Sequence, residues 1–209
     1  MRTQVLELYT AYFNRAADTV GVNYWLNEMD NNGWSISDVA QSFSQQTEYT
    51  NLYAGLSNAQ VVSKVYTNVL NRTADEAGAA YWESELTNDN ISVNQLVQAV
   101  ITAATEKDTN GNYKNSDDAE LFNNKIEISE YYYNKNINST DVSLSDITKE
   151  DFTMESLKVN ADNTIFIESL FEKYPNSIGK TEESVKYWVS NLNNGDSTYE
   201  SAEEFFNYI

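Results

Sequence analysis

Hydrophobic residues near the N-terminus recur with the period of an α-helix. In the segment VLELYTAYF, the apolar positions fall at i, i+3, i+4 and i+7, which is the spacing of one buried helix face. These positions are Val5, Leu8, Tyr9 and Tyr12, and the same spacing returns at Val62, Val65, Tyr66 and Val69. The pattern predicts two amphipathic helices that are copies of one another.

Two further helices are predicted after each of these. The apolar positions of the next helix are Tyr24, Trp25 and Met29 in the first copy and Tyr81, Trp82 and Leu86 in the second. The segments SISDVAQSF and SVNQLVQAV then each begin with a Ser three residues before an Asp or a Gln. That spacing is typical of a capping box, in which the Ser side chain accepts from the third helical N–H. Each copy therefore reads as helix, charged loop, helix, short polar turn and helix.

This periodicity predicts an all-α fold, a helical bundle built from repeated three-helix units. Only seven Gly and one Pro interrupt the 209 residues, and both residue types break helices. Residues 1–107 are expected to hold two tandem units, at 5–50 and 62–107. Residues 108–165 are expected to form a linker loop, a long helix and a polar connection, and residues 166–209 a degenerate third unit.

The third unit keeps only part of the pattern. Tyr187 and Trp188 repeat the Tyr-Trp pair of the first two copies. Where those copies have Arg, Asp and Gly, the third has Ile178, Thr181 and Ser184. Terminal repeats are often atypical because one side of them faces solvent.

The loop after the first helix carries the most specific repeated pattern, NRAADTVGVNYW from Asn14 and NRTADEAGAAYW from Asn71. Its Asp is well placed to cap the following helix. Its Arg can donate to that same Asp and to nearby helix-end carbonyls. Its Gly lies inside a helix, where Gly costs roughly 1 kcal/mol against Ala, so a backbone or a ring is expected to pack closely there, the neighbouring Trp first.

Two readings of this pattern compete, a duplicated building block and a duplicated ligand site. Pairs of Arg and Asp that close a loop are ordinary devices at helix corners, so we interpret the pattern as structural. The residues of this motif are Arg15, Asp18, Gly21 and Trp25 in the first copy and Arg72, Asp75, Gly78 and Trp82 in the second. Both Trp side chains are expected to be largely buried.

The composition removes several classes of enzyme. The chain contains no His and no Cys, so a Ser-His-Asp triad, a Cys nucleophile and a His- or Cys-based zinc site cannot form. Its few glycines form no phosphate-binding loop. A glycosidase needs two facing carboxylates, but Glu182-Glu183 and Glu203-Glu204 are adjacent on helices and point in different directions. We therefore predict that the protein is not an enzyme.

The charge constrains the partners. The formal net charge is −19, from 32 acidic and 13 basic residues. Nucleic acids and anionic lipid surfaces are bound largely through basic residues, so neither is an expected partner. No apolar run approaches the ~18 residues that cross a bilayer, so membrane insertion is not expected. The N-terminal residues MRTQVLELYTAYFNR lack the profile of a signal peptide.

The repeated unit resembles the domain-of-unknown-function family 4214. The residues that carry the resemblance are Tyr9, Arg15, Asp18, Gly21, Tyr24 and Trp25, then Tyr66, Arg72, Asp75, Gly78, Tyr81 and Trp82. The resemblance covers 5–50 and 62–107 well and 166–209 weakly. It implies a helical domain of bacterial surface proteins and proteins secreted by the type I route, and it implies no catalytic residues.

Two such units followed by a helix like AELFNNKIEISEYYY also resemble the N-terminal region of Gram-negative S-layer proteins, which attaches the lattice to lipopolysaccharide. The resemblance therefore implies an extracellular protein at the cell surface, exported without an N-terminal signal peptide. We expect a non-enzymatic anchoring module that binds a surface polysaccharide, the O-antigen of lipopolysaccharide. The alternative is an assembly or linker scaffold that contacts other protein chains, including copies of itself in a lattice.

Sugar binding uses aromatic faces together with amide and carboxylate hydrogen bonds. The chain is rich in both, with 15 Tyr, 4 Trp and more Asn than Lys and Arg together, although aromatic residues at helical spacing usually belong to the core. The candidates are therefore aromatic residues that depart from the repeat. They are Trp34, Tyr113, Tyr131, Tyr132 and Tyr133.

Calcium is a possible cofactor of one polar loop. Oxygen-bearing side chains of the kind that calcium prefers are concentrated there. They belong to Asp108, Asn110, Asn112, Asp117 and Asp118. The spacing is not that of an EF-hand, and the simpler interpretation is a solvated turn in which Asp117 caps the next helix.

Overall fold

The computed structural model describes residues 1–137, 143–145, 154–174 and 181–208. In these residues the chain forms eleven helices and no strand, so the predicted all-α fold is confirmed. The chain divides into two compact units, Met1–Phe152 and Thr153–Ile209. None of the helices that the structure describes is apolar over a length that would cross a membrane.

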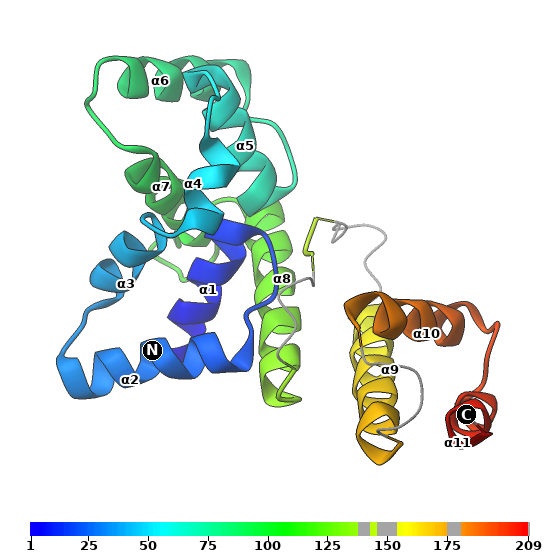
Figure 1. Cartoon of the computed structure of the whole chain (residues 1–209). Coiled ribbons are helices and arrows are strands. Elements are labelled where there is room, and N and C mark those ends of the chain that lie inside the picture. The colour runs from blue at the N-terminus through cyan, green and yellow to red at the C-terminus, as the bar shows by residue number, and fades with distance from the viewer. Residues whose placement is uncertain (138–142, 146–153, 175–180, 209) are drawn as a thin grey trace. The chain divides into compact units, whose positions relative to one another are not determined.

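The first unit contains both clear copies of the repeat (Figure 1). The first copy comprises α1 (Arg2–Phe13), α2 (Thr19–Asn32) and α3 (Ile36–Phe43), and the second comprises α5 (Asn58–Leu70), α6 (Glu76–Thr87) and α7 (Val93–Thr105). A short helix that the sequence pattern did not predict, α4 (Thr47–Tyr53), connects the two copies.

Side-chain caps begin these helices at the expected residues. Asp18 accepts from the backbone N–H of Gly21 at 2.7 Å, and Asp75 accepts from that of Gly78 at 2.8 Å. Ser35 and Ser92 each begin a complete capping box, α3 with Asp38 and α7 with Gln95. Both predicted boxes are therefore present.

The ends of α1 and α5 are also alike. Each helix ends at an Asn in the left-handed conformation, Asn14 with φ 51° and Asn71 with φ 48°. Asn tolerates this conformation better than most residues because its short side chain can hydrogen-bond locally. The Asn that opens each repeated loop therefore terminates the preceding helix.

Helix α1 lies at the centre of the first unit and packs against α2, α3, α4, α5, α7 and α8. All four of its predicted core residues are buried. The core around the first copy is aromatic, because Tyr9, Tyr12 and Trp25 all pack against Phe43 of α3.

The segment predicted as a linker, 108–165, does not form a region of its own. Its long helix, α8 (Ser116–Asn134), packs against α1, α5 and α7 as part of the first unit. Asn115 caps α8 by accepting from the backbone N–H of Asp118, so the cap is not Asp117 as expected. The polar connection that follows lies outside the described residues except for 143–145.

The second unit contains the degenerate copy, with α9 (Met154–Lys173), α10 (Glu182–Asn194) and α11 (Tyr199–Tyr208). Thr181 begins α10 with a capping box in place of the Asp cap. The core of this unit gathers Ile167, Phe171, Trp188 and Phe206 around buried Ala202. Ile178, which stands near the place of the missing Arg, lies outside the described residues.

Candidate functional site

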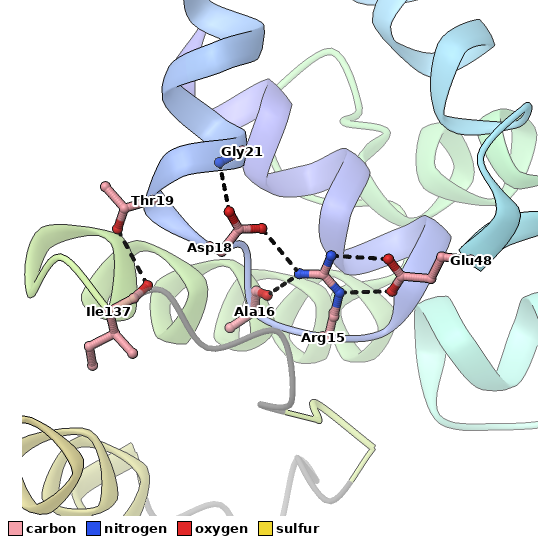
Figure 2. A network of polar contacts seen from close by, with 7 residues as sticks. All are labelled: Arg15, Ala16, Asp18, Thr19, Gly21, Glu48 and Ile137. Carbon is pink, nitrogen blue, oxygen red and sulfur yellow. Dashed lines mark hydrogen bonds and ion pairs between the residues drawn. The ribbon is translucent and has the colours of Figure 1, made fainter. Parts of the chain in front are cut away.

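Arg15 closes the loop between α1 and α2 by donating to several acceptors (Figure 2). Its Nε and Nη2 donate to the two carboxylate oxygens of Glu48 in α4, at 2.8 and 3.1 Å. Its Nη1 donates to the backbone oxygen of Ala16 at 3.0 Å and lies 3.7 Å from the Asp18 carboxylate. Although burial opposes it, the Glu48 carboxylate raises the pKa of Arg15 above its ordinary value. The predicted contact with Asp18 is present, but the main partner is Glu48.

The second copy uses a different acid. Nε and Nη2 of Arg72 donate to the carboxylate oxygens of Asp118 in α8, at 2.8 and 2.6 Å, and Nη1 donates to the backbone oxygen of Thr73. Within the described ranges no ion pair joins Arg72 to Asp75, so the expectation that Asp75 is its partner is wrong. Arg72 therefore forms a bidentate ion pair with Asp118, which is stronger than a contact with one carboxylate oxygen.

Each Arg therefore connects its loop to the helix that follows the three-helix unit. Glu48 belongs to α4 and Asp118 to α8, so each acid lies on the fourth helix of its copy, although the acids follow their Arg residues by different lengths of chain, 33 and 46 residues. In both copies the Arg donates to both carboxylate oxygens of its acid at a helix corner, which supports the structural interpretation of the motif. The side chain of Arg15 is only 11% exposed, which leaves little of its surface for a ligand.

The helical glycines do make room for a neighbour, but the neighbour is not the expected Trp. A Cβ on Gly21 would overlap the hydroxyl of Tyr9 and lie 3.0 Å from the Asp18 carboxylate oxygens. A Cβ on Gly78 would lie 3.4 Å from Asp75 and 3.5 Å from the hydroxyl of Tyr66, which is ordinary contact. The close approach is therefore a Tyr hydroxyl, and it is tight only in the first copy.

These distances predict opposite effects for one substitution. Gly21→Ala should lower the free energy of unfolding by about 1–3 kcal/mol, because buried Tyr9 must move to admit the methyl group. Gly78→Ala should raise it by up to about 1 kcal/mol, because the methyl group fits and Ala favours the helix. Urea denaturation of the two variants measures both changes, and a loss of stability in Gly78→Ala equal to that in Gly21→Ala would contradict the explanation.

The two Trp side chains of the motif differ in burial. Trp25 is 6% exposed, as expected. Trp82 is only partly buried, so it is less buried than Trp25. Its neighbours are smaller: Ile91 and Val100 occupy the places that Trp34 and Phe43 hold in the first copy. Trp82 is held by a hydrogen bond from its Nε1 to the hydroxyl of Tyr66 at 3.1 Å.

A buried lysine joins the two copies at the Asn residues that begin the loops. Nζ of Lys125 in α8 donates to Oδ1 of Asn14 at 2.9 Å, to Oδ1 of Asn71 at 2.6 Å and to the backbone oxygen of Asn68 at 2.7 Å. The side chain is fully buried, and no carboxylate of the described residues pairs with it. Burial lowers the pKa of Lys125 to about 7.

The predicted sugar-binding aromatic residues do not form one site. Tyr132 is 1% exposed and belongs to the core, so it is wrong as a binding candidate. Trp34 is half-buried and packs against Trp25, with ring centroids 5.9 Å apart. Tyr133 is half-buried and donates to Oδ1 of Asn23 at 2.7 Å.

The other two candidates, Tyr113 and Tyr131, are half-buried. The ring of Tyr113 lies 4.6 Å from Nζ of Lys107, and that of Tyr131 lies 5.2 Å from Nζ of Lys135. These contacts hold each ring beside a lysine of its own segment. They do not bring the two rings together.

The loop considered for calcium is closed by its own backbone. Oδ1 of Asp108 accepts from the backbone N–H groups of Asn110 and Asn112, at 2.8 and 2.9 Å. Asp118 is turned to Arg72, while Asp117 is exposed. Nowhere in the described residues do three or more acidic groups gather closely enough to hold a metal ion. The prediction that Asp118 is a calcium ligand is therefore wrong, because its carboxylate is paired with Arg72.

A different set of residues is exposed at equivalent places in all three copies. The Tyr of each Tyr-Trp pair faces solvent: Tyr24 is 52%, Tyr81 55% and Tyr187 62% exposed. The expectation that Tyr24 and Tyr81 belong to the apolar face is therefore wrong. Each Tyr ring lies edge-on against the following Trp, with centroids 4.8, 4.8 and 5.7 Å apart.

Two polar side chains continue each Tyr along the same helix face, three and seven residues later. All of them are exposed. We call these sets the tyrosine–amide stripes: Tyr24, Asn27 and Asn31 on α2; Tyr81 and Ser84 on α6 with its C-cap Asn88; and Tyr187, Ser190 and Asn194 on α10. In each stripe the last Asn donates to the side chain four residues before it, at 2.7, 3.3 and 3.5 Å.

The third copy keeps its tyrosine–amide stripe although it lacks the residues of the structural motif. The third copy has no Arg, Asp or Gly at the matching places, yet it keeps Tyr, a small polar residue and Asn at the same three positions. The exposed residues are therefore retained in a copy that lacks the Arg, the Asp and the Gly. The spacing Tyr-x-x-(Asn/Ser)-x-x-x-Asn is present in the sequence of all three copies, but the apolar pattern predicts that the Tyr belongs to the core face.

Comparison with known families agrees with the repeat. The family model described as Domain of unknown function (DUF4214) matches residues 2–53 and again residues 40–110. The two matches correspond to α1–α4 and to the region from α4 to α7, and together they cover more than half of the chain. No curated protein and no solved structure matches the chain.

Proposed function

From the premise that the chain belongs to the DUF4214 family, we propose that it is a non-enzymatic module that binds a polysaccharide through its tyrosine–amide stripes. The single observation that supports this function is the exposure of the same Tyr, polar residue and Asn in all three helical copies. The ligand that we propose is a cell-surface polysaccharide, the O-antigen of lipopolysaccharide. The module would anchor a secreted surface-layer protein outside the cell.

The chemistry of one stripe suits a sugar ring. A Tyr ring offers a flat apolar face and a hydroxyl, and it loses little conformational entropy because it has only two side-chain torsions. The Trp beside each Tyr limits how the ring can move. Each Asn amide has two N–H donors and an acceptor, so the intrahelical bonds, one from Asn31, one from Asn194 and two from Asn88, leave capacity for sugar hydroxyls.

Repetition of the stripe suits a repeating ligand. Within the first unit, α2 and α6 lie at opposite ends (Figure 1), so a short oligosaccharide would reach only one of their stripes. A long polysaccharide can occupy several stripes at once, and the second contact then benefits from a high effective concentration. Binding should therefore depend strongly on chain length.

The proposal is tested by removing all three rings together. The variant Tyr24→Ala/Tyr81→Ala/Tyr187→Ala should bind immobilised smooth lipopolysaccharide about 100-fold more weakly than the unaltered chain, because avidity multiplies the three losses. Each single variant should lose about threefold to tenfold. Surface plasmon resonance on smooth lipopolysaccharide, with rough lipopolysaccharide as reference, measures the change.

The control variant is Tyr208→Ala, because Tyr208 is 92% exposed but lies outside the stripes. Its binding should be unchanged, and all five variants should keep the melting temperature of the unaltered chain. Binding with and without a calcium chelator separates direct recognition from a calcium bridge. Unchanged binding by the triple variant would refute the stripes as the site.

The alternative, a protein assembly scaffold, predicts a different result for the same variants. Exposed Tyr residues are also enriched at protein interfaces. If the chain binds no polysaccharide but forms ordered oligomers that the triple variant abolishes, the stripes are an interface between protein chains. Analytical ultracentrifugation of the unaltered chain and the triple variant distinguishes the two functions.

A further inference from the structure

The first unit contains an open cleft of about 240 Å³ where the two copies meet the segment 143–145. The C-terminal end of α1 and the loop after it form one wall, with Phe13, Asn14 and Arg15. The rest of the lining consists of Leu52 of α4, Lys64 and Asn68 of α5, and Ser143 and Ser145. The cleft is distinct from the tyrosine–amide stripes, which lie on α2, α6 and α10.

The cleft is cationic although the chain as a whole is strongly acidic. Lys64 lines it and pairs with no carboxylate among the described residues. Nζ of Lys125 lies directly behind the wall, since it donates to Asn14 and Asn68, which both line the cleft. Arg15 also lines the cleft, but its charge is neutralised by the bidentate ion pair with Glu48. The cleft therefore carries a positive charge that no described carboxylate neutralises, although the chain has a net charge of −19.

The other lining groups can contact a polyhydroxy ligand. The hydroxyls of Ser143 and Ser145 lie 2.9 Å apart, and Nδ2 of Asn14 donates to Oγ of Ser145 at 2.9 Å. Asn68 is 97% buried in the wall, where its amide lies near the hydroxyl of Tyr53. Phe13 and Leu52 add apolar surface.

We infer that this cleft binds an acidic sugar residue, one that carries a carboxylate or a phosphate group, with Lys64 facing the anionic group. The inference rests on the proposed function, and it specifies the class of polysaccharide that the protein would prefer. At an ionic strength of about 0.15 M, charges more than about 8 Å apart are largely screened. The distant acidic residues then repel the ligand little, while Lys64 acts at contact distance.

The test compares two probes that differ only in charge. The full chain should bind oligogalacturonate about tenfold more tightly than the methyl ester of the same oligosaccharide, as measured by calorimetry at 0.15 M salt. Lys64→Gln should remove this preference while leaving binding of the methyl ester unchanged. Lys107→Gln is the matched control, because it removes the same charge from an exposed position outside the cleft and should keep the preference.

Each other outcome has a defined meaning. Competition by galacturonic acid but not by glucose 6-phosphate identifies a carboxylate as the anionic group, and the reverse result identifies a phosphate. Equal binding of the acid and its ester, or an equal effect of Lys64→Gln and Lys107→Gln, refutes the cleft while leaving the stripes in place. Failure of the chain to bind either probe or smooth lipopolysaccharide refutes the proposed function and this inference together.

Discussion

Raising the pH from 7 to 9 is expected to stabilise the protein by about 2 kcal/mol, because the buried amine of Lys125 loses its proton in the folded state. Burial lowers the folded-state pKa of Lys125 to about 7, whereas an unfolded lysine titrates near about 10.4. Between these values the unfolded chain holds a proton that the folded chain lacks, so the free energy of unfolding rises with pH. Urea denaturation at pH 7, 8 and 9 measures the slope.

The rise in stability is expected to end at higher pH, because the ionisation of tyrosines changes the free energy of unfolding in the opposite direction. Burial raises the pKa of Tyr9 and of Tyr12 to about 12. Above about pH 10 these residues would ionise in the unfolded chain but not in the folded one, so stability should fall again. Maximum stability is therefore expected near pH 9.

The variant Lys125→Met tests whether the amine of Lys125 causes the pH dependence of stability. Met keeps much of the length and apolar volume of the stem but cannot titrate, so the rise in stability between pH 7 and 9 should disappear. At pH 9 the variant should be less stable by about 2–4 kcal/mol, because Oδ1 of Asn14 and Oδ1 of Asn71 lose their buried donor. A variant that kept the slope of the unaltered chain would show that another group causes it.

The position of Lys125 also shows what local sequence cannot predict. A lysine is rarely fully buried. Leu121, Phe122 and Ile128 place Lys125 on the apolar face of α8, but these neighbours do not indicate which groups accept from its amine. Its acceptors come from Asn14, Asn68 and Asn71, which are 111, 57 and 54 residues away. The acids that pair with Arg15 and Arg72 were missed for the same reason, since they lie 33 and 46 residues along the chain.

The features that could be predicted depend on neighbours within one turn of helix. The caps at Asp18 and Asp75, and the capping boxes that begin at Ser35 and Ser92, follow from groups three residues apart. The exposure of Tyr24 was not predictable in this way. Tyr24 and Trp25 are adjacent aromatic residues about 100° apart around the helix, and only the packing of α1 and α3 determines which of them is buried.

The same packing argument predicts that Trp25 is sensitive to substitution. Its ring contacts Phe43 and Trp34, with centroids 5.3 and 5.9 Å away, and only 6% of the residue is exposed. Trp25→Ala should lower the free energy of unfolding by about 3–5 kcal/mol, because the neighbouring rings cannot close the resulting cavity. Thermal and urea denaturation, followed by circular dichroism, measure the loss.

Trp82→Ala provides the internal comparison, because it makes the same change at the equivalent position of the second copy. Trp82 is only partly buried beside the aliphatic Ile91, and its clearest specific contact is the hydrogen bond to Tyr66. Less apolar area is lost and the site opens to solvent, so the cost should be about 1–2 kcal/mol. Two losses of equal size would mean that burial of the Trp ring does not determine the stability of each copy. A larger loss for Trp25→Ala would place the main core of the first unit around the aromatic first copy.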